Sequence, residues 1–248
     1  MKNYLKYVFV FLWFMMIMNP IHSQVKHSHD IVLGFLQLKD EFGLGLVFNG
    51  GQLEYRYGLQ WKINEQEIQY QPKLGLGLAF SRGLMGIQTH IAPVNVTWTT
   101  PFFERDGHVI KGGANLITDY NHQFYELHDG PIFWNTEIGV SPIICYGYQF
   151  DNKRINVRLQ NSVIGFTSHR PGYDPYIWSF TWKDFVIYPN QDLKFGSFNH
   201  YNHTKVSLGF VPNISRKHAF AYEFDYLGFF YENRFYRINH NLVWRVSL

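Results

Sequence analysis

The sequence predicts an all-β protein, a closed antiparallel β-barrel of about ten to twelve strands that crosses a membrane. The first observation is the segment at 154–165, which alternates between apolar and polar residues. A strand turns successive side chains to opposite faces, so this segment has one apolar and one polar face. The apolar face carries Ile155, Val157 and Leu159, and the polar face carries Asn156, Arg158 and Gln160.

The second observation is that this two-faced pattern recurs along the chain. The predicted strands are 30–38, 42–48, 52–62, 73–80, 86–99, 110–124, 132–148, 154–165, 176–187, 194–210, 219–230 and 236–248. Turn-forming sequences separate several of them: NGG at 49–51, SRGL at 81–84, DNK at 151–153, RPGYDP at 170–175, PNISRK at 212–217 and EN at 232–233. Because single-chain bacterial barrels have an even number of strands, we expect twelve, with ten as the alternative.

The third observation is the composition of the two faces, which indicates that the apolar face is outside. Many positions on the polar faces are Gly or Ala, which suits a crowded barrel interior better than a solvated surface. The apolar faces carry Tyr and Trp near strand ends, where their polar tips would reach a membrane interface.

The last predicted strand, YRINHNLVWRVSL at 236–248, alternates up to the final residue. Here the chain resembles the bacterial outer-membrane β-barrel proteins, whose closing strand serves as an assembly signal and usually ends in Phe or Trp. Leu248 departs from that habit. The resemblance implies a location in the cell outer membrane of a diderm bacterium, with outer-membrane lipid and the barrel assembly machinery as partners.

The first 24 residues have the pattern of a secretory signal peptide, with Lys2 and Lys6 before an apolar core at 7–18. We therefore expect a signal peptide at 1–24 and one outer-membrane barrel domain at 25–248. Without those two lysines the chain has 20 basic residues against 19 acidic ones, and it has no basic tract, so nucleic-acid binding is not expected. Cys145 is the sole cysteine, which excludes an internal disulfide and a cysteine-based zinc site.

The charged and amide side chains of the polar faces are the candidate residues of the barrel interior. They are Glu54, Arg56, Lys62, Glu137, Arg158, Gln160, Lys183, Glu223, Asp225, Arg237 and Arg245. An interior of this kind predicts a narrow porin-like channel for small solutes, or a structural or binding barrel. No cofactor or metal is expected: the cluster Glu126, His128 and Asp129 lacks the spacing of a metal site and predicts a solvated turn.

Two alternatives remain open. The first is an outer-membrane lipid hydrolase of the phospholipase or lipid A deacylase type, since such members of the resembled superfamily place His and Ser two apart on one strand. The segment 198–210 comes nearest, with His200, His203, Thr204 and Ser207 as candidates, although the spacing itself is missing there. The second is a soluble, exported β-barrel that binds a small apolar ligand in an apolar interior.

Overall fold

The computed structural model describes residues 25–41, 45–126, 132–162, 164–171, 190–197, 200–215, 217–230 and 234–248. The strands are β1 (Lys26–Asp40), β2 (Val47–Ile63), β3 (Gln66–Tyr70), β4 (Lys73–Ser81), β5 (Leu84–Arg105), β6 (His108–Tyr125), β7 (Ile132–Phe150), β8 (Lys153–Ser162), β9 (Ile164–Pro171), β10 (Lys194–Ser197), β11 (Tyr201–Val211), β12 (His218–Phe230) and β13 (Arg234–Ser247). The signal peptide at 1–24, the strand at 176–187, Lys183, His128 and Asp129 lie outside the described residues.

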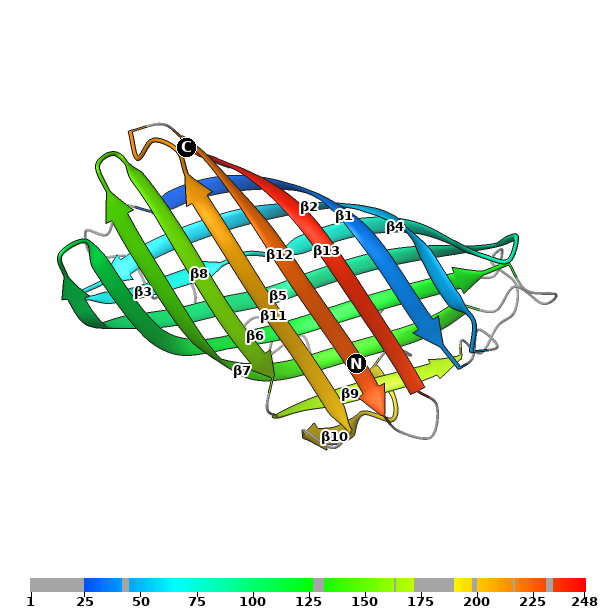
Figure 1. Cartoon of the computed structure of the whole chain (residues 1–248). Coiled ribbons are helices and arrows are strands. Elements are labelled where there is room, and N and C mark those ends of the chain that lie inside the picture. The colour runs from blue at the N-terminus through cyan, green and yellow to red at the C-terminus, as the bar shows by residue number, and fades with distance from the viewer. Residues whose placement is uncertain are drawn as a thin grey trace.

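These strands close into one antiparallel barrel with ten positions around its wall (Figure 1). Three positions are filled by two pieces in line: β3 with β4 between β2 and β5, β8 with β9 beside β7, and β10 with β11 on the far side of that pair. The first and last strands, β1 and β13, pair over thirteen residues from Ser28↔Ser247 to Asp40↔Phe235 and complete the ring. The fold class is confirmed, with a strand count at the lower end of the expected range.

One error in the sequence prediction accounts for a surplus strand. The NGG sequence was expected to be a turn, but residues 49–51 lie inside β2. A Cβ at position 50 would come within 1.9 Å of the Leu78 carbonyl oxygen on β4, so this glycine permits a close approach of two strands. The predicted segments 42–48 and 52–62 therefore do not form separate strands.

The two ends of the barrel differ in their connections. At the end that holds Lys26 and Ser247, called here the terminal end, the turns are 64–65, 106–107, 151–152 and 212–217. The first three carry a left-handed residue, Asn64, Asp106 and Asp151, as tight hairpins require. The connections at the opposite end, the loop end, are 41–46, 82–83, 126–131, 172–193 and 231–233. The longest connection, 172–193, falls at the loop end, while six-residue connections occur at both ends.

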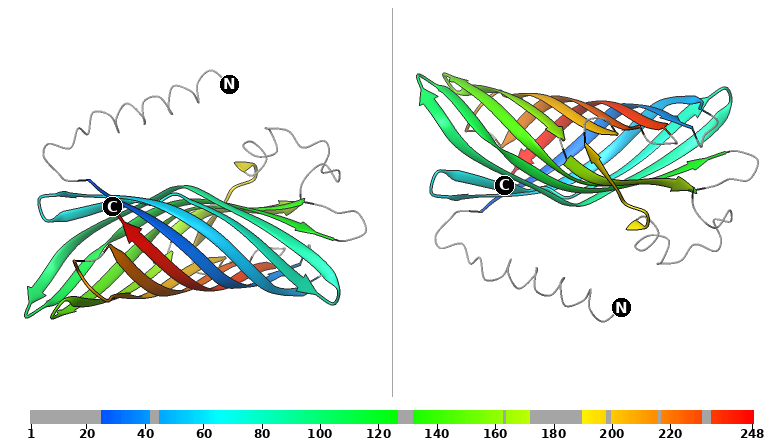
Figure 2. Two further views of the ribbon diagram at one scale, coloured as in Figure 1. Left: turned by 90° about the horizontal axis from the view of Figure 1, so that it is seen from above. Right: turned by 90° about the horizontal axis from the view of Figure 1, so that it is seen from below.

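The wall has an apolar outer face and a polar inner face. Large apolar side chains are exposed on the outside, among them Leu33, Leu53, Leu76, Leu208 and Leu242. Figure 2 gives two further views of the tilted strands that carry them. Val157 and Leu159 lie on this outer face, whereas the guanidinium of Arg158 reaches the hydroxyl of Thr97 across the interior at 3.1 Å. This arrangement is the reverse of a soluble barrel with an apolar interior.

Aromatic and histidine side chains pair on the outer face near the terminal end. His27 bonds to the Tyr57 hydroxyl at 2.7 Å, His108 bonds to the Tyr146 hydroxyl at 2.8 Å, and the Trp244 indole donates to His218 at 3.3 Å. Such amphipathic rings favour the boundary between hydrocarbon and water. No helix among the described residues is long and apolar enough to cross a membrane.

An apolar cluster fills the inside of the barrel at the loop end. Its buried members come from strands all around the wall: Leu36, Leu38, Phe48, Ala79, Tyr125, Phe133, Tyr201, Leu227, Phe229 and Phe235. Each is at most 3% exposed. We call this set the plug, because side chains from opposite sides of the ring meet in it without leaving access to water.

Candidate functional site

Below the plug, the interior holds a network of charged side chains centred on Arg237 of β13. The Nη2 atom of Arg237 lies 3.8 Å from Asp119 on β6 and 3.7 Å from Asp225 on β12, and its Nη1 donates to Asn121. The Arg237 and Asp119 side chains have no exposed surface. Buried charges in proteins require such partners, since an isolated ion in a low-dielectric interior is very costly.

Two histidines extend this network, and each lies between two carboxylates. His90 on β5 contacts Glu54 through Nδ1 at 2.9 Å and Asp119 through Nε2 at 2.8 Å. His203 on β11 contacts Glu137 through Nδ1 at 2.7 Å and Asp225 through Nε2 at 3.1 Å. The Tyr201 hydroxyl also donates to Glu137. Polar contacts therefore run without interruption across the barrel.

This geometry predicts that both ring nitrogens of His90 and of His203 carry a proton. An ionised carboxylate only accepts hydrogen bonds, so a ring held between two of them is satisfied on both sides only as the imidazolium. We expect nitrogen NMR of the histidine-labelled protein at neutral pH to show two imidazolium rings, which disappear in the His90→Gln and His203→Gln variants. Neutral tautomer signals from these two rings would contradict the arrangement.

Toward the terminal end the network continues through further ion pairs. Arg56 contacts Glu54 on its own strand and Glu223 on β12, the latter at 2.7 Å. Arg245 forms two hydrogen bonds of 2.7 Å with Asp30, and Lys111 lies 2.6 Å from Glu67. The Arg245–Asp30 pair joins β13 to its backbone neighbour β1, and the Lys111–Glu67 pair joins β6 to β3 across the intervening β5.

Exposure of the interior groups on β11, β12 and β13 rises from the plug to the terminal end, whereas Asp30 on β1 and Arg56 on β2 stay 0% and 5% exposed. The side chains of His203 and Glu137 are 0% and 1% exposed, Asp225 is 9%, Lys205 is 17%, Glu223 is 23% and Arg245 is 36%. Nearer that end the interior positions are small, as at Ser28, Gly58, Ala219 and Ala221. The interior is therefore accessible from the terminal end and sealed at the loop end.

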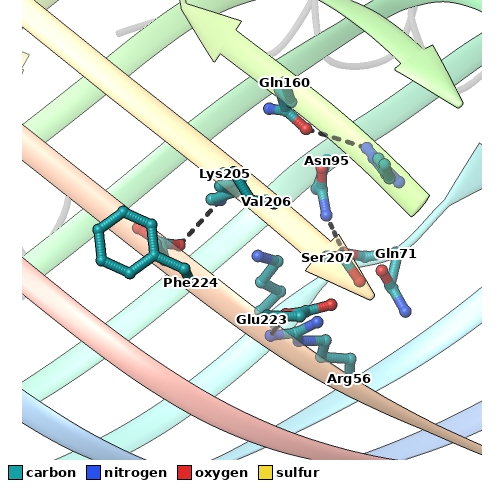
Figure 3. A pocket seen from close by; sticks show the side chains of 12 residues that line it. Arg56, Gln71, Asn95, Gln160, Lys205, Val206, Ser207, Glu223 and Phe224 are labelled. Atoms are coloured by element: carbon teal, nitrogen blue, oxygen red, sulfur yellow. Dashed lines mark hydrogen bonds and ion pairs between the residues drawn. The ribbon is translucent and has the colours of Figure 1, made fainter. Parts of the chain in front are cut away.

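A cavity of about 40 Å³ lies where the exposed and sealed parts meet. Its wall includes charged residues from β2, β4, β8, β11 and β12. Figure 3 shows Arg56, Lys205, Gln160 and Glu223 arranged around it. The space is narrow, because ion pairs and amide side chains fill most of the interior around it.

The structure brings together nine of the residues that the sequence assigned to the interior. They are Glu54, Arg56, Glu137, Arg158, Gln160, Glu223, Asp225, Arg237 and Arg245. Lys62 does not join them: it is exposed near the terminal end of β2, beside the turn residues Asn64 and Glu65. Lys183 lies outside the described residues.

The candidate hydrolase residues are not gathered into one site. His203 points inward between its two carboxylates, while His200 is exposed beyond the loop end of β11. Thr204 lies on the outer face, where its hydroxyl accepts from Asn161 at 2.6 Å and donates to Asn202 at 2.8 Å. Ser207 borders the interior cavity, four residues along the strand from His203. No hydroxyl among these four residues contacts a histidine ring nitrogen.

Sequence reasoning missed several members of the network, notably Asp30, Lys73, His90, Asp119 and Lys205. Lys73 and Lys205 lie on the inward faces of their strands, so the alternation of residues could have identified both of them. Asp119 also follows the regular alternation of β6, in which Asn115, Ile117 and Asn121 are buried as well. His90 is harder, because β5 carries an extra residue in its register with β6 between Ile91 and Val94. A bulge of this kind reverses the inside and outside positions along the strand, so simple alternation fails there.

Comparisons with known proteins give a likeness in structure alone. No family model matches the chain, and no curated protein matches it by sequence. The outer membrane protease OmpT from Escherichia coli is similar in structure with a TM-score of 0.50 and 8% identity, over 92% of this chain and 96% of that one. An outer membrane channel from Pseudomonas putida F1 gives 0.41 and 9%, over 92% and 98%. Neisserial surface protein A gives 0.36 and 10%, over 90% and 98%.

Identities this low carry no information about activity, so the likeness concerns the architecture of the barrel. That architecture agrees with the apolar outer face and the polar interior of this chain. The chain has the fold of the bacterial outer-membrane β-barrel proteins.

Proposed function

We propose that this protein is an integral outer-membrane barrel that works as a binding barrel, with a polar cup open at the terminal end and a sealed loop end. The single observation that carries this proposal is the rise in exposure of the interior groups on β11, β12 and β13, from 0% at His203 to 36% at Arg245. A constitutively open porin would leave interior side chains wet over the whole height of the barrel. The plug, with members at most 3% exposed, argues against that.

The connections support an orientation for the cup. Outer-membrane barrels have short periplasmic turns and longer extracellular loops. The tight turns 64–65, 106–107 and 151–152 are at the terminal end together with 212–217, while the longest connection, 172–193, is at the loop end. The cup therefore faces the periplasm in our proposal, and the plug lies toward the cell exterior.

Cysteine labelling tests the cup with two matched positions on one strand. Ala221 and Leu227 share the inner face of β12, the first partly exposed and the second fully buried in the plug. In a Cys145→Ser background, we expect a charged thiol reagent to modify Ala221→Cys rapidly and Leu227→Cys at least ten-fold more slowly. We also expect the purified protein to give no stepwise current in a planar bilayer. Equal labelling of both positions, together with stepwise current, would establish an open channel instead.

A further inference from the structure

We propose that the floor of the cup is a binding site for a small oxyanion of the phosphate type, held by Lys73 and Arg158. This inference rests on the proposed function only in that the ligand would enter through the cup. The charge of the cavity wall is its first support. Four cations line it, Arg56, Lys73, Arg158 and Lys205, against two acids, Glu223 and Asp225, which leaves a formal excess of two positive charges.

The acids are already occupied by two of those cations. Glu223 lies 2.7 Å from Arg56, and Asp225 lies 3.3 Å from Lys205 and 3.1 Å from His203. Neither acid lies within ion-pair distance of Lys73 or Arg158. Lys73 and Arg158 are therefore the two cations of the wall without an ion pair, although Glu54, which contacts Arg56, also acts electrostatically on Lys73.

Lys73 is the strongest indication of a missing ligand. It is 7% exposed and lies on the inward face of β4, yet it has no hydrogen bond or ion pair to any described residue. An ammonium this deeply buried, whose only access is to a small cavity, has little water around it and no carboxylate contact to compensate for that loss. An anion in the cavity would supply that contact.

Arg158 approaches the same cavity from β8 with part of its guanidinium unused. Its Nη2 donates to Thr97 at 3.1 Å and to Gln160 at 3.0 Å, and Gln160 is itself held by a hydrogen bond of 2.9 Å to Asn115. The Nε and Nη1 groups have no acceptor among the described residues. The free Nε and Nη1 groups lie on different edges of the guanidinium, one on each side of the occupied Nη2, so each can donate a single hydrogen bond to an oxygen of an oxyanion.

The volume of the cavity limits the class of ligand. At roughly 10–15 Å³ for each water molecule by the same measure, a cavity of about 40 Å³ holds about three waters. That space suits a tetrahedral anion and excludes a whole sugar or nucleotide. The ligand is either free inorganic phosphate or the phosphate group of a small ester whose remainder extends into the cup.

Calorimetric titration of the detergent-solubilised, folded full chain tests the site. We expect inorganic phosphate to bind at least ten-fold more tightly than chloride at equal ionic strength. The Lys73→Met/Arg158→Gln variant should lose at least ten-fold in phosphate affinity. The control Lys62→Met/Arg154→Gln removes the same two residue types from exposed positions near the terminal end and should bind as the unmodified protein does. A parallel titration with glycerol 3-phosphate assigns the source: tighter binding of the ester indicates a phosphorylated solute, and weaker or equal binding indicates the free ion.

Phosphate binding no tighter than chloride, or an unchanged affinity in the Lys73→Met/Arg158→Gln variant, would overturn the inference. Heat-modifiable gel mobility verifies that each variant is folded, and the comparison of phosphate with chloride on the unmodified protein needs no variant. The outcome is separable from that of the labelling experiment. An open lumen with phosphate binding that depends on Lys73 would refute the sealed cup alone, whereas a sealed cup without phosphate binding would refute the oxyanion site alone.

Discussion

Replacing Arg237 with alanine is expected to lower the free energy of unfolding by about 3–5 kcal/mol, the range for breaking a buried ion pair from one side. The substitution leaves Asp119 and Asp225 without the cation that lies between them, and Asn121 without its donor. Because Arg237 and Asp119 have no exposed surface, water cannot replace the lost contacts.

Reversible urea unfolding in detergent micelles would measure this effect, with Arg154→Ala as the control. Arg154 is an exposed arginine near the terminal end of β8, and its loss should change stability by no more than about 0.5 kcal/mol. Because Asp119 keeps His90 and Asp225 keeps His203 and Lys205, adding Asp119→Asn to Arg237→Ala removes the partner of His90 and should not recover the loss. A loss below about 1 kcal/mol for Arg237→Ala would mean that the network is hydrated and that the interior is not sealed at this depth.

Replacing Leu76 with arginine is expected to destabilise the membrane-inserted barrel by about 2–4 kcal/mol, the cost of a cation at the bilayer midplane on a barrel surface. Leu76 is 60% exposed on the outer face of β4, between the exposed side chains of Leu74 and Leu78. An arginine there would face hydrocarbon without an anionic partner on either neighbouring strand, where Leu53 of β2 and Thr89 of β5 lie opposite.

The matched control is Ile63→Arg, which introduces the same side chain on the outer face at the terminal end of β2. Near the interface the cost falls to about 0–1 kcal/mol, because the guanidinium reaches water and headgroups. Unfolding from lipid vesicles measures both variants. If Leu76→Arg cost no more than Ile63→Arg, or if both were neutral as on a soluble surface, the outer face would not be in contact with lipid.

The alternation of residues was sufficient to predict the architecture, because a strand wall has a fixed inside and outside. Leu159 and Arg158 are a clear case, since adjacent residues of opposite character had to lie on opposite faces, and they do. The strand count was harder to predict. A glycine such as Gly50 is compatible both with a turn and with a close approach of two strands. Which of the two it serves depends on the position of the neighbouring strand, which the sequence does not show.

The candidate site could be predicted only in part for a related reason. Partners such as Glu54 with His90 and Glu137 with His203 lie on strands that are not neighbours in the wall, and they meet across the interior. Alternation predicts whether a side chain points inward or outward. It does not predict the position of that side chain along the barrel axis, which depends on the register of every intervening strand. The bulge near Ile91 and the interruptions in β3–β4 and β8–β9 determine the positions of these side chains along the barrel axis. The local sequence contains no signal for either feature.

The pairing of β1 with β13 has a consequence for how the protein reaches its final form. The last backbone contact joins the amide of Leu248 to the carbonyl of His27, so the closing seam unites two segments that are separated by nearly the entire chain. A chain truncated before residue 234 would lack β13 and would leave β1 and β12 with unpaired edges inside the bilayer. The backbone amides of those edges would have no hydrogen-bond partner there. The cylinder therefore closes only when both β1 and β13 are in place.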